Sequence, residues 1–341
     1  MAKISRGMIV GASTLLGKEL AEELSGAQPA WELSLAGAGE ESGQLVAAGD
    51  EAAVIQPLEP GVFAGQDVAF FAENAATTRA HWLEARRANA GVVDLTAVLE
   101  GEAGAAVRAP WVSGGAAPDM TTAIVVPAHP AAVMLGVVGS RLRAAFGPVR
   151  LAATVLEPAS QQGSRGLAEM HRQTVSLLGF HALPQEVYDA QVAFNLRVSV
   201  GSAAKLDMGK IVAAIRRHLT AIAGEEISAS TAMQLVQAPV FNGYTMSVYV
   251  ELPEKAAAAA VREALQGGVV DVVDRGDESP NNQIASGNEG IQLMLREETA
   301  HANASRGYWL WMAADNLKLA ARNAVACAAE MAALRPVGDA Q

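Results

Sequence analysis

The N-terminal part of the chain alternates short apolar segments with helix-like segments, and this alternation constrains the fold more than any other feature. Residues 8–10 predict a short buried strand, and a glycine-bounded turn leads from it into a helix at residues 18–25, where leucines recur at helical spacing. Later candidates are strands at 32–36, 53–56, 67–72 and 91–95 and a helix at 75–90. Strands that alternate with helices predict a parallel sheet with right-handed crossovers.

The turn after the first strand consists of Gly11, Ala12, Ser13, Thr14, Leu15, Leu16 and Gly17. In a dinucleotide-binding fold, glycines here let the backbone approach the pyrophosphate, which sits at the positive end of the helix dipole. The middle position holds Thr14, so two interpretations stay open: a phosphate-binding turn, or a tight turn that only packs a helix on a strand. Glu40 lies close to the usual offset of about 20 residues for an acid that binds ribose hydroxyls, or it is a solvated loop acid.

Length and charge limit the class of protein. A chain of 341 residues exceeds what one hydrophobic core usually covers, so we expect two domains. The net charge of −11 argues against binding to nucleic acid or to an anionic membrane through bulk electrostatics. No apolar run reaches the roughly 18 residues that a membrane helix needs, and the N-terminus does not resemble a signal peptide, so we expect a cytoplasmic protein.

A second strand-to-helix transition lies in the middle of the chain. Residues 121–126 predict a strand, which two prolines separate from an apolar helix at 131–145. The N-terminus of a helix is a natural position for a nucleophile, because the helix dipole lowers the pKa of a thiol there. The first residues of this helix are Ala131, Ala132 and Val133, none of which can act as a nucleophile.

The rest of the chain predicts further helices and strands. Helices are expected at residues 167–178, 208–223, 254–266 and 315–333, and strands at 149–156, 244–251 and 268–273. A polar loop is expected at 276–288. Asp315 is a suitable N-cap for the last helix, because its side chain can accept a hydrogen bond from the first helical turn.

Several segments together are similar to the aspartate-semialdehyde dehydrogenase family. They occur in the family's order over nearly the whole chain, at residues 11–19, 67–72, 92–94, 160–174, 194–196, 239–243 and 315–317. The resemblance implies an α/β fold with a Rossmann-like NAD(P)-binding domain at residues 1–128 and 312–341. It also implies an α+β dimerisation and substrate domain at residues 129–311, and a homodimer.

The family reduces an acyl phosphate to an aldehyde. It uses a cysteine thiolate as nucleophile, NADPH as hydride donor, a histidine as acid and base, and arginine and glutamine to hold the substrate. By this resemblance the cysteine position falls on Ala132, just after His129, and the histidine position falls on Tyr244. The arginine position falls on Gln237 and the substrate glutamine on Glu157. These substitutions remove the nucleophile, the group that titrates near neutrality and the cation that binds a carboxylate.

The cofactor positions also depart from the family pattern. Glu40 lies where family members place an arginine for the 2′-phosphate of NADP, so the resemblance favours NAD over NADP. Asn74 belongs to the pair that replaces a Gly-Gly of the family, and Asn316 lies in the last matching segment. With the turn at residues 11–17, these residues are the candidate nucleotide site, and Glu157, Gln237 and His129 are the candidate substrate pocket.

The chain has one cysteine, Cys327, in an alanine-rich helical segment, where we expect a structural thiol. No pair of histidines has metal-ligand spacing, so no metal site is predicted. The leading hypothesis is a semialdehyde dehydrogenase-like protein, a pseudoenzyme without the thiol-based reduction of acyl phosphate. One alternative is an active NAD(P)-dependent oxidoreductase that acts on an aldehyde or oxo group of another substrate. A second is a non-catalytic partner of an active paralogue.

Overall fold

The computed structural model describes residues 5–28, 31–48, 51–112, 124–274, 276–298 and 304–334. Within these residues the chain forms two compact units. The first contains the chain up to Ala128 and again from Ala320, and the second contains His129–Leu319. Strand β15 (Ser305–Ala314) belongs to the sheet of the second unit, so the chain returns to the first unit later than residue 312.

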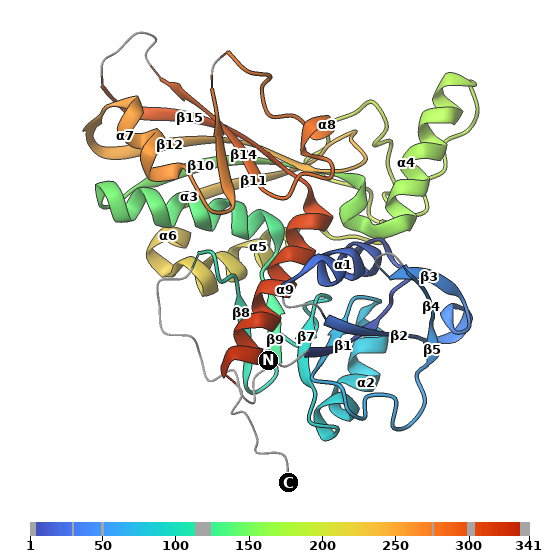
Figure 1. Cartoon of the computed structure of the whole chain (residues 1–341). Coiled ribbons are helices and arrows are strands. Elements are labelled where there is room, and N and C mark those ends of the chain that lie inside the picture. Colours follow the sequence, from blue (N-terminus) through green and yellow to red (C-terminus); the bar gives the residue numbers. More distant parts are fainter. Residues whose placement is uncertain are drawn as a thin grey trace. The chain divides into compact units, whose positions relative to one another are not determined.

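The first unit is built on a seven-stranded sheet with strand order β5-β2-β1-β6-β7-β9-β8 (Figure 1). The strands are β1 (Ser5–Val10), β2 (Trp31–Gly37), β5 (Gln56–Pro57), β6 (Val68–Phe71), β7 (Gly91–Asp94), β8 (Ala105–Arg108) and β9 (Ile124–Pro127). All of their pairings are parallel, which confirms the Rossmann-like sheet. The connections reverse direction at β1, and open α/β sheets bind ligands at such a point.

Helices cover both faces of this sheet. Helix α1 (Leu15–Gly26) and the part of α9 (Asn316–Leu334) from Ala320 onward share a core with Ile9 of β1. Helix α2 (Ala75–Arg87) packs in a second core that includes the neighbouring residues Met8 and Val10 of β1. Because successive strand residues point to opposite faces, the two cores lie on opposite sides of the sheet. A short 3-10 helix, η1 (Gly39–Glu41), follows β2.

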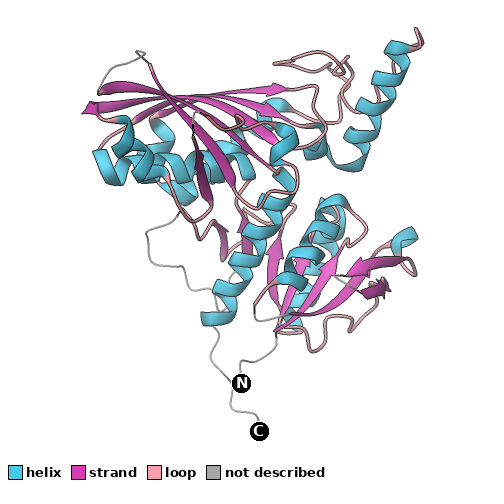
Figure 2. Cartoon of the chain, turned by 45° about the horizontal axis from the view of Figure 1, so that its top comes forward, coloured by secondary structure: helices cyan, strands magenta, loops and turns pink. Residues whose placement is uncertain are grey.

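The second unit is built on a six-stranded mixed sheet with order β11-β10-β12-β15-β14-β13. Its other strands are β10 (Arg150–Glu157), β11 (Thr231–Gln237), β12 (Tyr244–Ala256), β13 (Val270–Val273) and β14 (Ile291–Glu297). Figure 2 shows helices along one face of this sheet. They are α3 (Pro130–Phe146), α5 (Met208–Ala223), α6 (Glu225–Ala229) and α7 (Ala258–Leu265). The remaining helices are η2 (Ala159–Gln162), α4 (Gly163–Leu178) and α8 (Asn282–Ala285).

The other face of the mixed sheet carries aromatic side chains that are partly exposed, and we call it the open face. Tyr249 of β12 pairs with Trp309 of β15, and their rings lie 5.1 Å apart. Ser247 pairs with Trp311 in the same register. Trp309 is 46% exposed and Trp311 is 38% exposed, whereas Tyr308, the residue before Trp309, is fully buried. The alternation places Tyr308 in the core and the two tryptophans on the open face.

Local interactions explain where the structure differs from the expected elements. The strand expected at 53–56 is instead the second arm of an antiparallel hairpin, β3 (Leu45–Ala48) and β4 (Glu51–Val54), followed by β5. Helix α7 begins at Ala258 rather than at residue 254, because β12 continues to Ala256 in a ladder with β15. The loop expected at 276–288 contains α8, whose N-cap is Asn281. Asp315 caps α9 as expected, since its Oδ1 accepts hydrogen bonds from the amides of Leu317 and Lys318.

Candidate functional site

The turn between β1 and α1 depends on its two glycines. Gly11 has a φ of +91°, and a Cβ there would lie 2.5 Å from the backbone nitrogen of Glu73. A Cβ on Gly17 would lie 2.1 Å from the carbonyl oxygen of Gly11. Both positions therefore exclude any other residue without a shift of the backbone. The amide of Gly11 donates to the carbonyl of Ala36 at 2.9 Å, which ties the turn to the end of β2.

Thr14, which occupies the middle position of the turn, is the N-cap of α1. Its hydroxyl accepts a hydrogen bond from the amide of Gly17 at 2.9 Å. The same oxygen lies 2.8 Å from the carbonyl oxygen of Gly11 and 3.1 Å from that of Ala72. A single hydroxyl thus joins the ends of β1 and β6 to the start of the helix, a role that glycine could not perform.

Glu41, one residue beyond the acid that the sequence suggested, lies next to this turn. Ser13 donates a short hydrogen bond to Glu41 Oε1. Glu41 Oε2 is buried and has no hydrogen-bond partner among the described residues. The backbone of Glu40 lies in η1, but its side chain falls outside the described part of the chain. Counting residues from the turn locates this acid only to within a position, so the offset could not distinguish the two.

Asn74 acts as the N-cap of α2 at the end of β6. Its Oδ1 accepts hydrogen bonds from the amides of Ala76 and Thr77 at 2.9 and 3.1 Å, and its Nδ2 donates to Glu73 Oε1 at 2.9 Å. All of these groups belong to the first unit, as do the turn and Glu41. Asn74 thus holds Glu73, and Glu73 lies directly against Gly11 of the turn.

In the second unit, an open pocket of about 860 Å³ lies beside the N-terminus of α3. Two sets of residues line it, which we call its first and second wall: His129, Gln161 and Gln162 are the first, and residues 198–202, 204–211 and 214 are the second. We call this the His129 pocket. Residues 179–207 include no helix or strand of the named elements, so the second wall depends on side chains that hold this long connection in place.

Two buried polar residues of α4 fix that connection. Glu169 accepts hydrogen bonds from the amides of Val187 and Tyr188, and Gln173 accepts from those of Val192 and Ala193. Glu169 and Gln173 are both fully buried and lie one helical turn apart, on the same face of the helix. The pocket is therefore supported by a hydrogen-bonded layer behind its loop wall, which no motif in the sequence indicated.

His129 is the N-cap of α3 and lines the pocket. Its Nδ1 accepts a hydrogen bond from the amide of Ala131 at 3.2 Å, and its own amide donates to His218 Nδ1 at 2.9 Å. Burial, with a smaller contribution from His218, lowers the pKa of His129 to about 3. The ring is therefore neutral at ordinary pH, and it cannot supply a positive charge to a ligand.

Glu157 does not line the pocket, and its two carboxyl oxygens contact Gln162 and Tyr244. Gln162 Nε2 donates to Glu157 Oε1 at 2.9 Å, and the Tyr244 hydroxyl lies 3.2 Å from Oε2. Burial raises the pKa of Glu157 to about 7, although both hydrogen bonds act to lower it. Burial and the Glu157 charge raise the pKa of Tyr244 well above its usual value. The Tyr244 ring lies 5.8 Å from the His129 ring, so the three candidate residues form one cluster.

Two other candidate residues lie next to this cluster, Gln237 at the end of β11 and Asn316 at the start of α9. Gln237 is buried, and its Nε2 donates to the carbonyls of Glu157 and Ala238 at 3.1 Å each. Asn316 belongs to the second unit as well. Its Oδ1 accepts hydrogen bonds from the Gly243 amide and the Ser160 hydroxyl at 3.0 Å each.

The two positions that concern the thiol lie in different units. Ala132 is fully buried in the first turn of α3, and its side chain is a methyl group. Cys327 is fully buried in α9, within the core that α1 shares with the parallel sheet. Its Sγ lies 3.7 Å from the Arg108 carbonyl oxygen, and burial raises the pKa of the thiol. Cys327 is thus a structural residue of the first unit.

Both halves of the chain match known family models. Residues 7–133 match the model described as "Semialdehyde dehydrogenase, NAD binding domain", and residues 140–319 match "Semialdehyde dehydrogenase, dimerisation domain". The chain belongs to the semialdehyde dehydrogenase family. This assignment agrees with the parallel sheet of the first unit and the mixed sheet of the second, and it confirms the family predicted from the sequence segments.

Similar members of the semialdehyde dehydrogenase family cover almost the whole chain. A "USG-1 protein homolog" of Pseudomonas aeruginosa is 30% identical over 93% of this chain and 94% of its own length. An aspartate-semialdehyde dehydrogenase of Rickettsia conorii is 26% identical over 85% of this chain and 86% of its own. A solved structure of a probable aspartate-semialdehyde dehydrogenase from Pseudomonas aeruginosa has a TM-score of 0.83, with 27% identity over 97% of this chain and 99% of that one.

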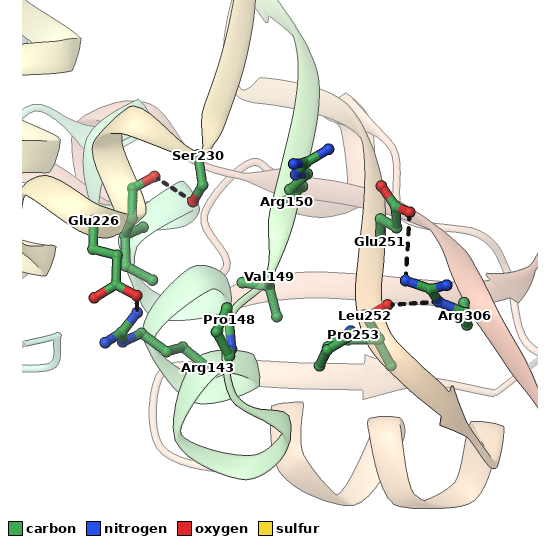
Figure 3. Close-up of a pocket in the computed structure, with 11 residues that line it drawn as sticks. Arg143, Pro148, Val149, Arg150, Glu226, Ser230, Glu251, Leu252, Pro253 and Arg306 are labelled. Carbon is green, nitrogen blue, oxygen red and sulfur yellow. Dashed lines mark hydrogen bonds and ion pairs between the residues drawn. The ribbon is translucent and has the colours of Figure 1, made fainter.

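A second pocket in the dimerisation domain contains charged groups that are mostly paired. It measures about 380 Å³. Figure 3 shows Arg143 beside Glu226 and Arg306 beside Glu251, and both contacts are ion pairs. Arg150 also lines this pocket and has no ion-pair partner among the described residues. We call it the arginine pocket. Its two ion pairs are exposed to solvent, so it is a poor candidate for the reaction site.

The described residues offer neither a metal site nor a membrane-spanning helix. Among these residues, no group of three or more His, Cys, Asp or Glu side chains is placed to hold a metal ion. None of the helices in the same part of the chain combines the length and the apolar character that crossing a membrane requires.

Proposed function

We propose that this family member does not reduce acyl phosphates through a thioacyl intermediate, and that its pocket binds a small ligand without covalent attachment. The observation that carries the proposal is the placement of the chain's single thiol. The family resemblance assigns the nucleophile to Ala132, a buried methyl group, while Cys327 lies in the core of the other unit. Loss of the nucleophile from a catalytic set can reduce turnover about a million-fold.

The neighbouring substitutions support the same conclusion. A carboxylate-binding guanidinium is replaced by Gln237, whose amide donates to backbone carbonyls. The family's acid and base is replaced by Tyr244, whose raised pKa keeps the phenol protonated. A tyrosine in this state can donate a hydrogen bond but cannot exchange protons rapidly near neutral pH.

The test is an assay for phosphate-dependent oxidation of aspartate semialdehyde with NAD or NADP. The expected result is no turnover by the wild-type chain, and none by a Cys327→Ala variant, which controls for the native thiol. Turnover by the wild-type chain that disappears in a Gln161→Leu variant would contradict the proposal, because that activity would have to originate in the His129 pocket.

For the cofactor, the first unit fits NAD better than NADP. The two glycines let the turn pack closely against its own main chain, as a dinucleotide-binding turn does, and buried Glu41 Oε2 lacks a donor that ribose hydroxyls would provide. A carboxylate at this place repels the 2′-phosphate of NADP. Bound nicotinamide nucleotide supplies or accepts a hydride. A thermal-shift comparison tests the preference, since a ligand that binds the folded state raises its stability. A larger shift with NADP than with NAD would contradict it.

A second candidate function is an oxidoreductase that acts on another oxo compound, and the pKa of Glu157 favours it. A carboxyl group that titrates at about 7 can release a proton near neutral pH, and a carbonyl oxygen takes up a proton when its carbon receives a hydride. A screen of aldehydes and keto acids with NADH tests this function. Turnover that falls at least tenfold in Glu157→Gln, with a changed pH profile, would establish it. Turnover with an unchanged profile would exclude Glu157 from the role.

For the assembly, the chain forms a homodimer through the open face of the dimerisation domain. Tyr249, Trp309 and Trp311 place a row of aromatic surface on that face, and such exposed apolar patches mark interaction sites. Light scattering on the wild-type chain should give a dimer, and Trp309→Lys should give a monomer. Leu83→Lys is the control, because Leu83 of the first unit is 45% exposed and Trp309 is 46% exposed.

A partner role for an active paralogue makes a different prediction about the same face. Purification of the tagged chain from its native host should then recover a second, related chain in equal amount. Recovery of this chain alone as a dimer would exclude that alternative. A monomeric wild-type chain would contradict both interpretations of the open face.

A further inference from the structure

Beside the His129 pocket, a chain of hydrogen bonds brings two donor groups face to face. Backbone amides begin it at both ends, and an amide nitrogen can only donate. At one end, the Gly243 amide donates to Asn316 Oδ1 at 3.0 Å. This contact fixes the orientation of the Asn316 side chain, so its Nδ2 faces Gln161 Oε1 at 3.4 Å. Gln161 in turn presents its Nε2 to His129 Nε2, at 3.3 Å.

At the other end, the Ala131 amide donates to His129 Nδ1 at 3.2 Å. A neutral imidazole has one protonated nitrogen and one acceptor nitrogen. Because Nδ1 accepts from Ala131, the proton lies on Nε2. The low pKa of His129 excludes the doubly protonated ring at ordinary pH. Two donors therefore meet in the pocket wall, His129 Nε2 and Gln161 Nε2, and neither can accept a hydrogen bond from the other.

The geometry points to a carboxylate-binding subsite, in which one oxygen of a small ligand accepts hydrogen bonds from both His129 Nε2 and Gln161 Nε2. Both side chains line the pocket. An acceptor between them removes the conflict that the two donors otherwise create, and a charged acceptor forms the stronger hydrogen bonds. This inference rests on the non-covalent ligand site proposed above and names the chemical class of its ligand.

The charges of the second wall favour a carboxylate over a neutral carbonyl group. Lys205 lines the pocket, is exposed and has no ion-pair partner among the described residues. Lys210 also lines it, at 3.8 Å from Asp207 Oδ2. With two lysines and one aspartate, the second wall has a net positive charge. Glu157 lies behind Gln162 and does not line the pocket, so its charge is separated from the ligand.

The experiment measures binding of succinate to the full chain at neutral pH by calorimetry, without nucleotide. Succinamide is the neutral analogue of similar shape, and propionaldehyde tests a carbonyl oxygen alone. We expect succinate to bind at least ten times more tightly than either, because hydrogen bonds to a charged group are the stronger ones. Equal binding of succinamide, preferential binding of propionaldehyde, or no binding of succinate would overturn the carboxylate subsite.

Five variants, two of them controls, test where succinate binds. Gln161→Leu and Lys205→Met should each weaken succinate binding about tenfold. Gln283→Leu and Lys255→Met are the matched controls, since both side chains are exposed, and they should bind as the wild type does. Unchanged binding in Gln161→Leu would overturn the inference. Arg150→Met tests the rival arginine pocket of Figure 3, and loss of binding in this variant alone would place the carboxylate there instead.

The tautomer of His129 gives a test that does not depend on a ligand. Long-range proton–nitrogen NMR spectra distinguish Nε2–H from Nδ1–H, and a His129→Asn variant assigns the signal. We expect the Nε2–H tautomer and a shift of its signal when succinate is added. An Nδ1–H tautomer would remove the second donor and overturn the inference. Neither readout involves turnover, so this inference can fail while the proposed loss of acyl phosphate reduction stands, and the reverse also holds.

Discussion

The glycine turn of the first unit and the His129 pocket of the second use different kinds of atoms to form a site. The turn is made of backbone, with glycines at the two positions where a Cβ would collide with neighbouring main chain. The pocket is made of side chains, namely His129, Gln161 and Gln162, with Glu157 and Tyr244 behind them. A backbone site tolerates few substitutions, whereas a side-chain site can change its chemistry and keep its shape. If the chemistry has changed as proposed, this difference explains how the family fold could persist around it.

Replacement of Gly17 tests whether the turn is as intolerant as its geometry indicates. We expect Gly17→Val to lower the free energy of unfolding by about 3 kcal/mol or more, because its Cβ would meet the Gly11 carbonyl oxygen. Gly26→Ala in the same helix is the control, since a Cβ there has no neighbour within 4 Å, and it should change stability by less than about 1 kcal/mol. Denaturant unfolding measures both. A small effect of Gly17→Val would show that the turn can adjust.

The pH dependence of stability tests the pocket. The pKa of Glu157 is raised from 4.5 to about 7 in the folded chain, so the folded state binds more protons between these values, and its stability falls as pH rises through them. The shift corresponds to a loss of about 3 kcal/mol, complete above neutral pH. Glu157→Gln should remove this dependence when unfolding is measured at several pH values. His129, with its lowered pKa, has the opposite slope at acid pH in both proteins, so only their difference isolates Glu157.

Thiol labelling tests whether the remaining cysteine belongs to the core or to a site. We expect Cys327 in the folded chain to react with a thiol reagent at least about a hundred times more slowly than in the unfolded chain, because the thiol is buried and its pKa is raised. Labelling in the presence and absence of denaturant measures the ratio. Rapid labelling of the folded chain would contradict the structural role and would make Cys327 a candidate nucleophile.

The smallest expected effect concerns Thr14, whose hydroxyl holds the turn to the first helix. Thr14→Ala removes the N-cap of α1 and should lower the free energy of unfolding by about 1 kcal/mol. Thr14→Ser keeps the hydroxyl and should retain most of the stability. Equal losses in the two variants would mean that the Thr14 methyl group, rather than its hydrogen bonds, stabilises the turn.

The sequence predicted the first unit better than the second for a physical reason. The elements around Gly11 are close in the chain, and their periodicity shows in a short window. The His129 pocket joins distant residues: Gln161 meets Asn316, 155 positions later, and His129 meets His218, 89 positions later. No local pattern reports such contacts, so Gln161 and Gln162 were not identified as site residues.

Strand β15 of the open face was not among the strands predicted from the sequence. Residues 308–312 around Trp309 are all large and apolar, so both sets of alternating side chains are apolar. Periodicity alone therefore could not tell which set faces the core, and the burial of Tyr308 beside exposed Trp309 becomes clear only from the register with β12. The offset from the glycine turn likewise pointed to Glu40, whereas the described side chain that contacts Ser13 is that of Glu41.

The sealed position of Cys327 makes the chain convenient for spectroscopy. With its only sulfhydryl enclosed by α1, α9 and the sheet, a cysteine introduced at Ser202 on the rim of the pocket would be the single accessible attachment point for a fluorophore. A dye at that position would report the entry of small molecules directly, without removal of any native residue.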